Sequence, residues 1–529
     1  MFTTRSRANR RIATCLVMLV TGVVSRDASA QGLSTTLIRN ASIMDGSGRP
    51  ARRGDVRISG DRIVGVGSPL APLPSDKVVD VHGFAIAPGF IDTHSHHDRG
   101  LIGARGGRGA GRGADSTSRV DPRAGLAMVS QGVTTIVIGQ DGGGSGLTEL
   151  FKSIEAQPPA VNIASYVGHG AIRSKVLGED FKRIATPAEI EKMKALVRED
   201  MNSGALGLST GLEYDPGIYS SPDEVLALAK VAGDMGGRYI SHIRSEDRWF
   251  WAALDEVITI GRVNHMPVQV SHIKLGMLDL WGQADSVIHV LSRARASGVQ
   301  VTADIYPYTF WQSNLGVLFP KRNFGDSVEA AFVLAHVSRA DGIIFNSFAR
   351  HPEYVGKNLA QVAQLRGTSE VRALLDLLAE PGGSSSGIVA RGMDDADVEK
   401  LIRWPFANVC SDGTSSGLHP RGFGSFAKVL GPYVRDKKLF SFEEAVRKMS
   451  SLAASNVGIR ERGMIEPGYY ADLVVFDPGA VKDNADFGPP GTAQRLATGV
   501  QTVWVNGQIV FESGKPTGAY PGRVIRRAK

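Results

Sequence analysis

The chain has 529 residues, of which 42% are apolar, and this is enough for a large hydrophobic core and a second, smaller domain. Its formal net charge is +7, but residues 1–30 contribute a net +4 from five arginines and one aspartate, so the rest of the chain carries only +3. This weak positive balance does not indicate a nucleic-acid partner, and no internal run of about 18 apolar residues indicates a membrane span.

The N-terminus has the pattern of a secretory signal peptide. A basic start with four arginines precedes an apolar run over residues 12–24, and Ala28-Ser29-Ala30 fits a cleavage site for small residues. We expect residues 1–30 to be removed and the protein to be exported, to the periplasm or the medium; a retained N-terminal anchor is the alternative. Cys410 is the only cysteine of the remaining chain, so no internal disulfide can form.

Residues 31–87 and 461–529 have the same character. Both alternate short apolar runs with turns, and Asn506-Gly507 is a strong hairpin signal. Neither segment contains enough strands to bury a core alone. We therefore expect the two ends of the chain to pair into one small, discontinuous β-sandwich domain.

Residues 88–460 alternate strands with helices. Thr186, Ser221 and Ser441 each stand three residues before a glutamate, which is the capping-box pattern of a helix start. Strand patterns recur at 90–93, 134–139, 161–167, 205–209, 238–241, 267–271, 300–305 and 408–411. Eight such repeats predict an α/β fold of the (β/α)8, TIM-like type, with both ends of the chain in the small β domain.

Two segments interrupt this alternation. Residues 310–400 are too long for one barrel connection, and we expect an insertion over the mouth of the barrel. Residues 103–113 are rich in glycine and arginine and should form a loop. This loop is similar to RNA-binding Gly/Arg segments, but it is one short copy in an exported chain, so nucleic-acid binding is disfavoured.

Histidines gather where the predicted strands end. Six of the twelve lie at or just beyond these ends, namely His94, His96, His97, His169, His242 and His272. His94 and His96 share one face of a strand, and the C-terminal ends of barrel strands carry the active site. The pattern predicts a hydrolytic zinc site with a position open for water. Asp412, at the end of the eighth strand, is the candidate general acid and base.

The chain resembles the amidohydrolase superfamily and, within it, the D-aminoacylase (N-acyl-D-amino-acid deacylase) family. The matching segments are 87–98, 131–139, 167–170, 204–211, 241–246, 270–274, 304–308, 411–413, 419–421 and 466–477. The resemblance implies the barrel with a discontinuous β domain, and a zinc enzyme that removes the acyl group from a D-amino acid. Its partner would be a small molecule with a free carboxylate.

The resemblance also implies roles for single residues. His242 and His272 match the ligands of a tightly bound zinc ion, and His94 and His96 those of a second, weakly occupied position. Asp412 matches the catalytic acid and base. Tyr214, Lys274, Tyr306 and Arg421 match or neighbour positions that hold the substrate's carboxylate, and His169 is a further candidate for substrate binding.

One position departs clearly from the family. Where relatives have Gly-Asn-Cys-Gly with a cysteine ligand, this chain has Gly139-Gln140-Asp141-Gly142. A carboxylate can still bind or bridge zinc, so we expect Asp141 to be a ligand, but a harder one that leaves the number of metal ions open. His97, where family members often have aspartate, is a smaller departure.

Other functions are weaker interpretations of the same residues. A hydantoinase-like cyclic amidase would need a carboxylated lysine after the fourth strand, where this chain has Leu208-Ser209-Thr210-Gly211. A dipeptidase acting on D- or isopeptide-linked dipeptides would use the same metal, base and carboxylate site. A catalytically inactive barrel that serves as an interaction module is the alternative from another class. The acyl group, the side chain accepted and the oligomeric state stay open.

Overall fold

The computed structural model describes residues 35–102, 120–488 and 491–528. The predicted signal peptide and the Gly/Arg-rich segment 103–113 lie outside these residues. Within them, no helix combines the length and the apolar character needed to cross a membrane.

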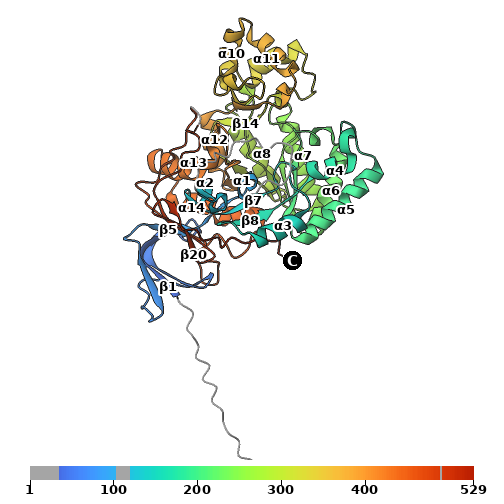
Figure 1. Cartoon of the computed structure of the whole chain (residues 1–529). Coiled ribbons are helices and arrows are strands. Elements are labelled where there is room, and N and C mark those ends of the chain that lie inside the picture. The colour runs from blue at the N-terminus through green and yellow to red at the C-terminus, as the bar shows by residue number, and fades with distance from the viewer. Residues whose placement is uncertain (1–34, 103–119, 489–490, 529) are drawn as a thin grey trace, which may run out of the picture. The chain divides into compact units, whose positions relative to one another are not determined.

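The central feature is a closed barrel of parallel strands (Figure 1). Its strands are β6 (Phe90–Asp92), β7 (Val133–Ile138), β8 (Asn162–Ser165) continued by β9 (Val167–Gly168), β10 (Gly207–Gly211), β11 (Arg238–His242), β12 (Val268–Val270), β13 (Val301–Ile305) and β17 (Ala407–Val409). A parallel bridge between Ser95 and Gly413 joins the last strand to the first. The predicted (β/α)8 fold is confirmed, and each strand lies within two or three residues of its predicted position.

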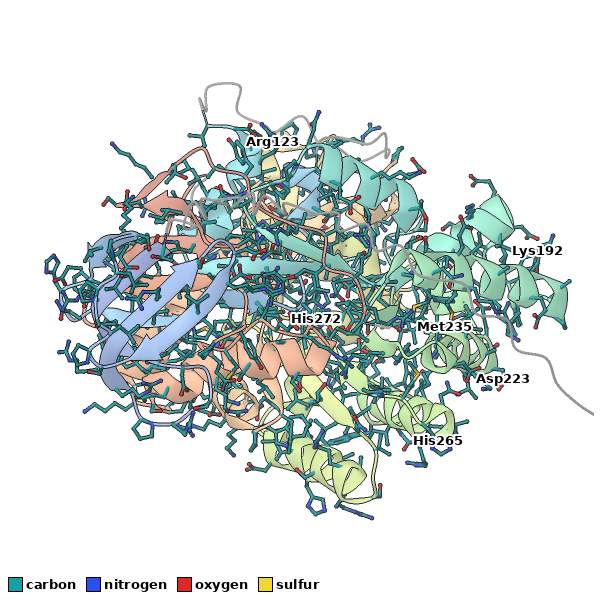
Figure 2. All side chains as sticks on the ribbon, turned by 90° about the horizontal axis from the view of Figure 1, so that it is seen from below. Arg123, Lys192, Asp223, Met235, His265 and His272 are labelled. Carbon is teal, nitrogen blue, oxygen red and sulfur yellow. The ribbon has the colours of Figure 1, made fainter. Side chains whose placement is uncertain are left out.

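Helices cover the outside of the barrel. The larger ones are α3 (Leu147–Ala156), α4 (His169–Leu177), α5 (Pro187–Ser203), α6 (Pro222–Asp234), α7 (Phe250–Asn264), α8 (Ala284–Ala296), α12 (Asp395–Arg403), α13 (Arg421–Lys428), α14 (Phe442–Met449) and α15 (Ser451–Val457). Thr186 and Glu189 form a complete capping box at the start of α5. In Figure 2 His272 lies toward the middle, whereas Lys192, Asp223 and His265 lie at the rim on or beside these helices.

Both ends of the described chain contribute to one nine-stranded sheet. Its strands are β1 (Thr35–Ile43), β2 (Arg52–Ser59), β3 (Arg62–Gly67), β4 (Asp76–Asp80), β5 (Ala85–Pro88), β18 (Leu473–Phe476), β19 (Val500–Val505), β20 (Gln508–Glu512) and β21 (Lys515–Pro516). Antiparallel pairing of β5 with β18 joins the two halves. Ile43, Val56 and Trp504 are buried in a cluster that both halves share, so neither half is complete alone.

The predicted insertion forms a compact unit between β13 and α12. It contains β14 (Phe310–Asn314), α9 (Ser327–Phe332), β15 (Ile343–Ser347), α10 (Leu359–Arg366), α11 (Glu370–Ala379) and β16 (Gly387–Arg391). The three strands form a sheet in the order β14-β16-β15, and the unit has its own buried cluster around Phe345 and Leu374. Figure 1 shows α10 and α11 together beyond β14.

Candidate metal centre

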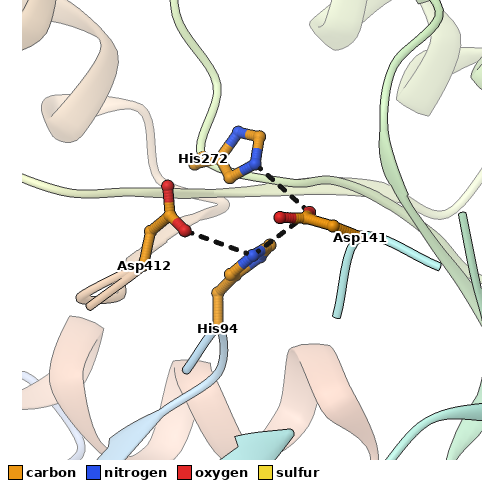
Figure 3. Close-up of side chains that lie close together, drawn as sticks. All are labelled: His94, Asp141, His272 and Asp412. Carbon is orange, nitrogen blue, oxygen red and sulfur yellow. Dashed lines mark ion pairs between the residues drawn. The ribbon is translucent and has the colours of Figure 1, made fainter. Parts of the chain in front are cut away.

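Four predicted site residues meet at the C-terminal ends of the barrel strands. His94 follows β6, Asp141 follows β7, His272 follows β12 and Asp412 follows β17. The Nε2 atom of His94 lies 3.3 Å from Oδ1 of Asp141 and 3.6 Å from Oδ1 of Asp412. Figure 3 shows this chain of contacts, which continues from Asp141 to His272. One potential ligand atom from each residue lies within 4.8 Å of the others.

The Asp141 carboxylate stands between the two pairs of histidines. Its Oδ1 lies 3.4 Å from Nε2 of His272, and its Oδ2 lies 3.2 Å from Nε2 of His96. His242, the last residue of β11, points Nδ1 at Nε2 of His272 at 3.2 Å. The Asp141 carboxylate, at the position where the resemblance implies a cysteine ligand, therefore faces histidines of both predicted metal positions.

The donor atoms fit a metal ion. Both ring nitrogens of His94 and Oδ1 of Asp141 are buried without a hydrogen-bond partner. Buried polar atoms of this kind are costly unless something pairs with them. Imidazole nitrogen and carboxylate oxygen are ligands that zinc accepts, and a cation among them would satisfy these atoms. Zinc is therefore a metal that the donor set can hold.

The electrostatics of the cluster favour positive charge. Burial opposes protonation of His96, but the carboxylates of Asp141 and Asp412 outweigh it and raise its pKa to about 9. Burial and Lys274 lower the pKa of His272, yet the surrounding carboxylates raise it to about 10. Because a ligand must be deprotonated to bind a metal, loading the centre releases protons.

The backbone of the cluster is held in an uncommon conformation. Asp141, His272 and Asp412 have φ values of 53°, 33° and 47°, in the left-handed region that non-glycine residues seldom occupy. Such residues persist where the surroundings fix them, and they concentrate at functional sites. Here the backbone N–H of His272 donates to the Asp304 carboxylate, and that of Asp412 donates to the carbonyl of His94.

Comparison with known proteins identifies the family. The amidohydrolase family model matches residues 77–339 and 388–511, well over half of the chain. The chain belongs to the amidohydrolase family. D-aminoacylase from Alcaligenes xylosoxydans xylosoxydans is 34% identical over 517 residues, which cover 93% of this chain and 97% of that protein. The part that the family model leaves unmatched, 340–387, lies within the insertion.

Two solved structures give the same result. A D-aminoacylase crystal structure matches with a TM-score of 0.80 and 32% identity, over 93% of this chain and 99% of that chain. N-acyl-D-glutamate deacylase from Bordetella bronchiseptica, solved with zinc and a phosphonate mimic of the tetrahedral intermediate, matches with the same TM-score of 0.80, identity of 32% and coverages of 93% and 99%. The resemblance indicated by the sequence motifs is confirmed.

The amidohydrolase site has an outer layer that the sequence interpretation did not assign. Glu246 lies 3.0 Å from Nδ1 of His272 and 2.6 Å from Nζ of Lys274, and Glu213 lies 3.0 Å from Nε2 of His242. Glu213 orients the ring of His242 from behind. Glu246 also forms a second group of potential metal ligands with His242 and His272. Their positions in the sequence could have identified these two glutamates, since Glu246 follows His242 by four residues and Glu213 directly precedes Tyr214.

The predicted substrate-binding cations lie beside the metal cluster. Arg421 and Lys274 both line a pocket with Tyr214, His272 and Asp412, and Trp311 of the insertion closes one side. Arg421 donates from Nη1 to Oδ2 of Asp412. Both cations are thus already engaged, Arg421 with the candidate base and Lys274 with Glu246.

Tyr306 lies behind these cations. Its ring centroid is 4.9 Å from the guanidinium carbon of Arg421 and 5.7 Å from Nζ of Lys274. Its hydroxyl is buried and has no hydrogen-bond partner. Burial, more than any neighbouring charge, raises its pKa well above the ordinary value, so the hydroxyl stays protonated and able to donate.

His169 and His97 do not join the cluster. The Nε2 of His169 lies 2.8 Å from Glu224, which also binds Arg173, and all three side chains are fully buried. His169 is not among the residues that line the pocket with Lys274 and Arg421, and the substrate role expected for it stays a prediction. His97 is buried with Nδ1 3.0 Å from the hydroxyl of Ser415, and burial lowers its pKa to about 4.

Proposed function

We propose that this amidohydrolase cleaves the amide bond of N-acyl-D-amino acids, giving a carboxylate and a free D-amino acid. The observation that carries the proposal is the placement of the metal-fitting cluster beside two cationic side chains, Lys274 and Arg421, in one pocket. The metal site would activate the amide bond for hydrolysis, and the cationic site would bind the α-carboxylate that every N-acyl amino acid has. The similarity to D-aminoacylase and N-acyl-D-glutamate deacylase supports this substrate class.

The metal would be held by His94, His272 and Asp141, because both rings face Oδ1 of Asp141, whereas His96 faces Oδ2. His242 lies beside His272 and forms a second group of potential ligands with His272 and Glu246. Bound zinc would supply a Lewis acid for the scissile carbonyl and an acidified water molecule. Asp412 performs the proton transfers. Burial disfavours its ionised form, but Arg421 and the neighbouring histidines outweigh burial and lower its pKa, so the carboxylate is ready to accept a proton.

The rest of the pocket orients the substrate. Arg421 contacts Asp412 and lies over the ring of Tyr306, so a carboxylate bound there would sit next to the candidate base. Tyr214 lies with its ring centroid 4.3 Å from that of His242 and forms another part of the wall. Substrate held on this side presents its amide to the metal cluster, which is the orientation that hydrolysis requires.

A dipeptidase is the second candidate, and one observation favours it. Glu213, Glu246 and Asp247 also line the pocket, so it contains more carboxylates than an N-acyl amino acid would use. The free ammonium group of a dipeptide could pair with one of them. D- or isopeptide-linked dipeptides would then be hydrolysed by the same metal cluster and Asp412.

Export is part of the proposal. The basic start, the apolar run and Ala28-Ser29-Ala30 support a signal peptide over residues 1–30, with the mature protein in the periplasm or the medium. N-terminal sequencing of the native protein should give Gln31 as the first residue. Recovery of a protein that retains residues 1–30 would refute cleavage.

The activity is tested with purified mature protein, added zinc and a substrate panel. N-acetyl-D-amino acids should be hydrolysed faster than their L-enantiomers and faster than dipeptides, and the Asp412→Asn variant should lose that activity. Preferred turnover of D- or isopeptide-linked dipeptides would select the second candidate. No hydrolysis of any member of the panel by zinc-loaded protein would overturn both.

A further inference from the structure

A second cationic pocket lies at the opposite, N-terminal end of the barrel strands. It has a cavity volume of about 250 Å³ and is lined by Arg238, Arg460 and Arg527, together with Ser455, Gly458 and others. Among the described residues that line it, none is acidic. Arg238 begins β11 and His242 ends it, so the pocket and the metal cluster are separated by the length of this strand, roughly 13 Å.

Arg238 is the innermost cation. It is partly buried, and within the described residues the structure gives its guanidinium no hydrogen bond and no ion pair. A Cβ atom placed on Gly458 would lie 2.5 Å from its Nε, so the guanidinium packs closely on the end of α15. Burial lowers the pKa of the Arg238 guanidinium, since it outweighs the opposing effect of Tyr166.

Arg527 approaches the same pocket from the C-terminal segment. Its Nε is buried without a hydrogen-bond partner, and its Nη2 donates only to the carbonyl of Met201, at 3.3 Å. Two nearby arginines of this segment do have acidic partners. Arg526 forms an ion pair with Glu155 at 2.7 Å, and Arg523 forms one with Asp61. Arg460 is exposed at the mouth of the pocket. The arginines of this segment that face outward thus have acidic partners, and the one that faces the pocket has none.

We propose that this arginine pocket, formed by Arg238, Arg460 and Arg527, binds a small doubly charged oxyanion, either free or as a phosphate monoester. A partly desolvated guanidinium without a counter-charge is unfavourable, and an oxyanion offers several acceptors at once. The hydroxyl of Ser455 can add a donor. The site is separate from the proposed amide hydrolysis, since it shares no residue with the metal centre.

The test is calorimetric titration of the metal-loaded enzyme with sodium sulfate, against sodium chloride at matched ionic strength. Sulfate is chosen because it coordinates metal ions weakly. Arg238→Met and Arg527→Met should each weaken sulfate binding by roughly tenfold or more, the loss expected for a charge-assisted hydrogen bond. Arg526→Met is the matched control, since this arginine belongs to the same segment but pairs with Glu155. It should change affinity by less than about twofold.

A parallel titration with glycerol 3-phosphate distinguishes the two forms of the ligand. If glycerol 3-phosphate binds at least tenfold more tightly than sulfate, and Arg238→Met loses this binding, the pocket is assigned to a phosphate monoester. If the two ligands bind with equal affinity, the pocket is assigned to the free anion. If Arg238→Met fails to fold by circular dichroism, Arg460→Met takes its place. Wild-type protein that binds neither anion, or pocket variants that bind both as wild type does, would overturn the proposal.

Discussion

Two clusters of buried ionisable side chains stand at the C-terminal ends of the barrel strands, and they differ in how their atoms are paired. In the cluster of His169, Glu224 and Arg173, both carboxylate oxygens bind a cationic or imidazole partner. Both clusters have buried nitrogen atoms without a hydrogen-bond partner, Nδ1 of His169 and Nε of Arg173 in the first and the two ring nitrogens of His94 in the metal cluster. Of the two clusters, only the metal cluster also has a buried carboxylate oxygen without one, Oδ1 of Asp141. Asp141, His272 and Asp412 of the metal cluster also have positive φ, whereas His169, Arg173 and Glu224 do not.

This difference separates a structural role from a functional one. A cluster whose carboxylate is paired on both oxygens needs no ligand to balance that charge, and removal of one partner destabilises the fold. A cluster that leaves a buried carboxylate oxygen unpaired and holds its backbone in an uncommon conformation is organised around a cation that it binds. Substitutions in the two clusters should therefore have opposite signatures, with metal and turnover lost in one and stability lost in the other.

The largest effect is expected for His272→Ala. This change removes the ring that Asp141, Glu246 and His242 all approach. Metal affinity should fall by more than roughly 100-fold, and turnover should almost disappear while the fold is kept. Metal analysis beside circular dichroism provides the measurement. A variant that keeps full metal content and rate would show that His272 is not a ligand.

Asp141 tests whether the carboxylate has taken over the role of the family's cysteine. Asp141→Ala should weaken metal binding sharply, because both carboxylate oxygens face histidines. Asp141→Cys should keep a zinc site, since thiolate is a good zinc ligand, but should reduce the capacity for a second ion. Metal stoichiometry by mass spectrometry decides the matter, and unchanged affinity in the alanine variant would reduce Asp141 to a turn residue.

Asp412→Asn should cost roughly 10²–10⁴-fold in turnover. The amide keeps the shape and the hydrogen bond from Arg421 but cannot carry a proton. Metal content should stay close to that of wild type if His94, His272 and Asp141 hold the ion without Asp412. A loss below tenfold with the metal intact would move the acid and base role to another group, of which Glu246 is the nearest to His272.

Lys274→Met should reduce kcat/KM on N-acetyl-D-amino acids by roughly ten- to a hundredfold, the range for one charge-assisted bond. The corresponding amides lack the carboxylate, so on them the loss should be small. The structure sharpens this test because Nζ of Lys274 also lies 2.6 Å from Nδ1 of His272. Equal losses on acids and amides would mean that Lys274 supports the ligand ring instead of binding substrate.

The barrel and the meeting of its strand ends follow from the sequence because parallel strands of a closed barrel present their C-terminal residues on one face. This rule places His94, His242, His272 and Asp412 together. It does not give the direction of side chains beyond the strands. His169 illustrates this limit, since it begins helix α4 and its ring turns to Glu224 on α6.

The outer layer was also beyond the sequence. The pairing of Lys274 with Glu246 joins residues from two different loops, and only the folded chain brings these together. The arginine pocket has the same origin, because Arg238, Arg460 and Arg527 are far apart in the sequence and share no motif. Strand patterns predict which face a residue lies on, but contacts between loops depend on how the elements pack.

The smallest effect on turnover is expected for Glu224→Gln, which tests the cluster of His169, Glu224 and Arg173. Removing the charge leaves Arg173 buried without its counter-ion, and this should lower the free energy of unfolding by roughly 3–5 kcal/mol at pH 7. Metal content and kcat should stay within about threefold of wild type, since Glu224 does not reach the metal cluster. If Glu224→Gln also loses metal, the cluster of His169, Glu224 and Arg173 belongs to the functional site.

The pH dependence of the free energy of unfolding provides a second, independent test of this prediction. Burial raises the pKa of Glu224, but the bonds from His169 and Arg173 outweigh it and the pKa is lowered overall. The ionised carboxylate therefore stabilises the fold above the ordinary glutamate pKa of about 4.3, and this contribution is lost as pH falls through the lower folded value. Denaturant unfolding should show the largest difference between wild type and Glu224→Gln near neutral pH and a narrowing difference in acid. A difference that stays constant from pH 7 to pH 3 would mean that Glu224 contributes by packing and not by charge.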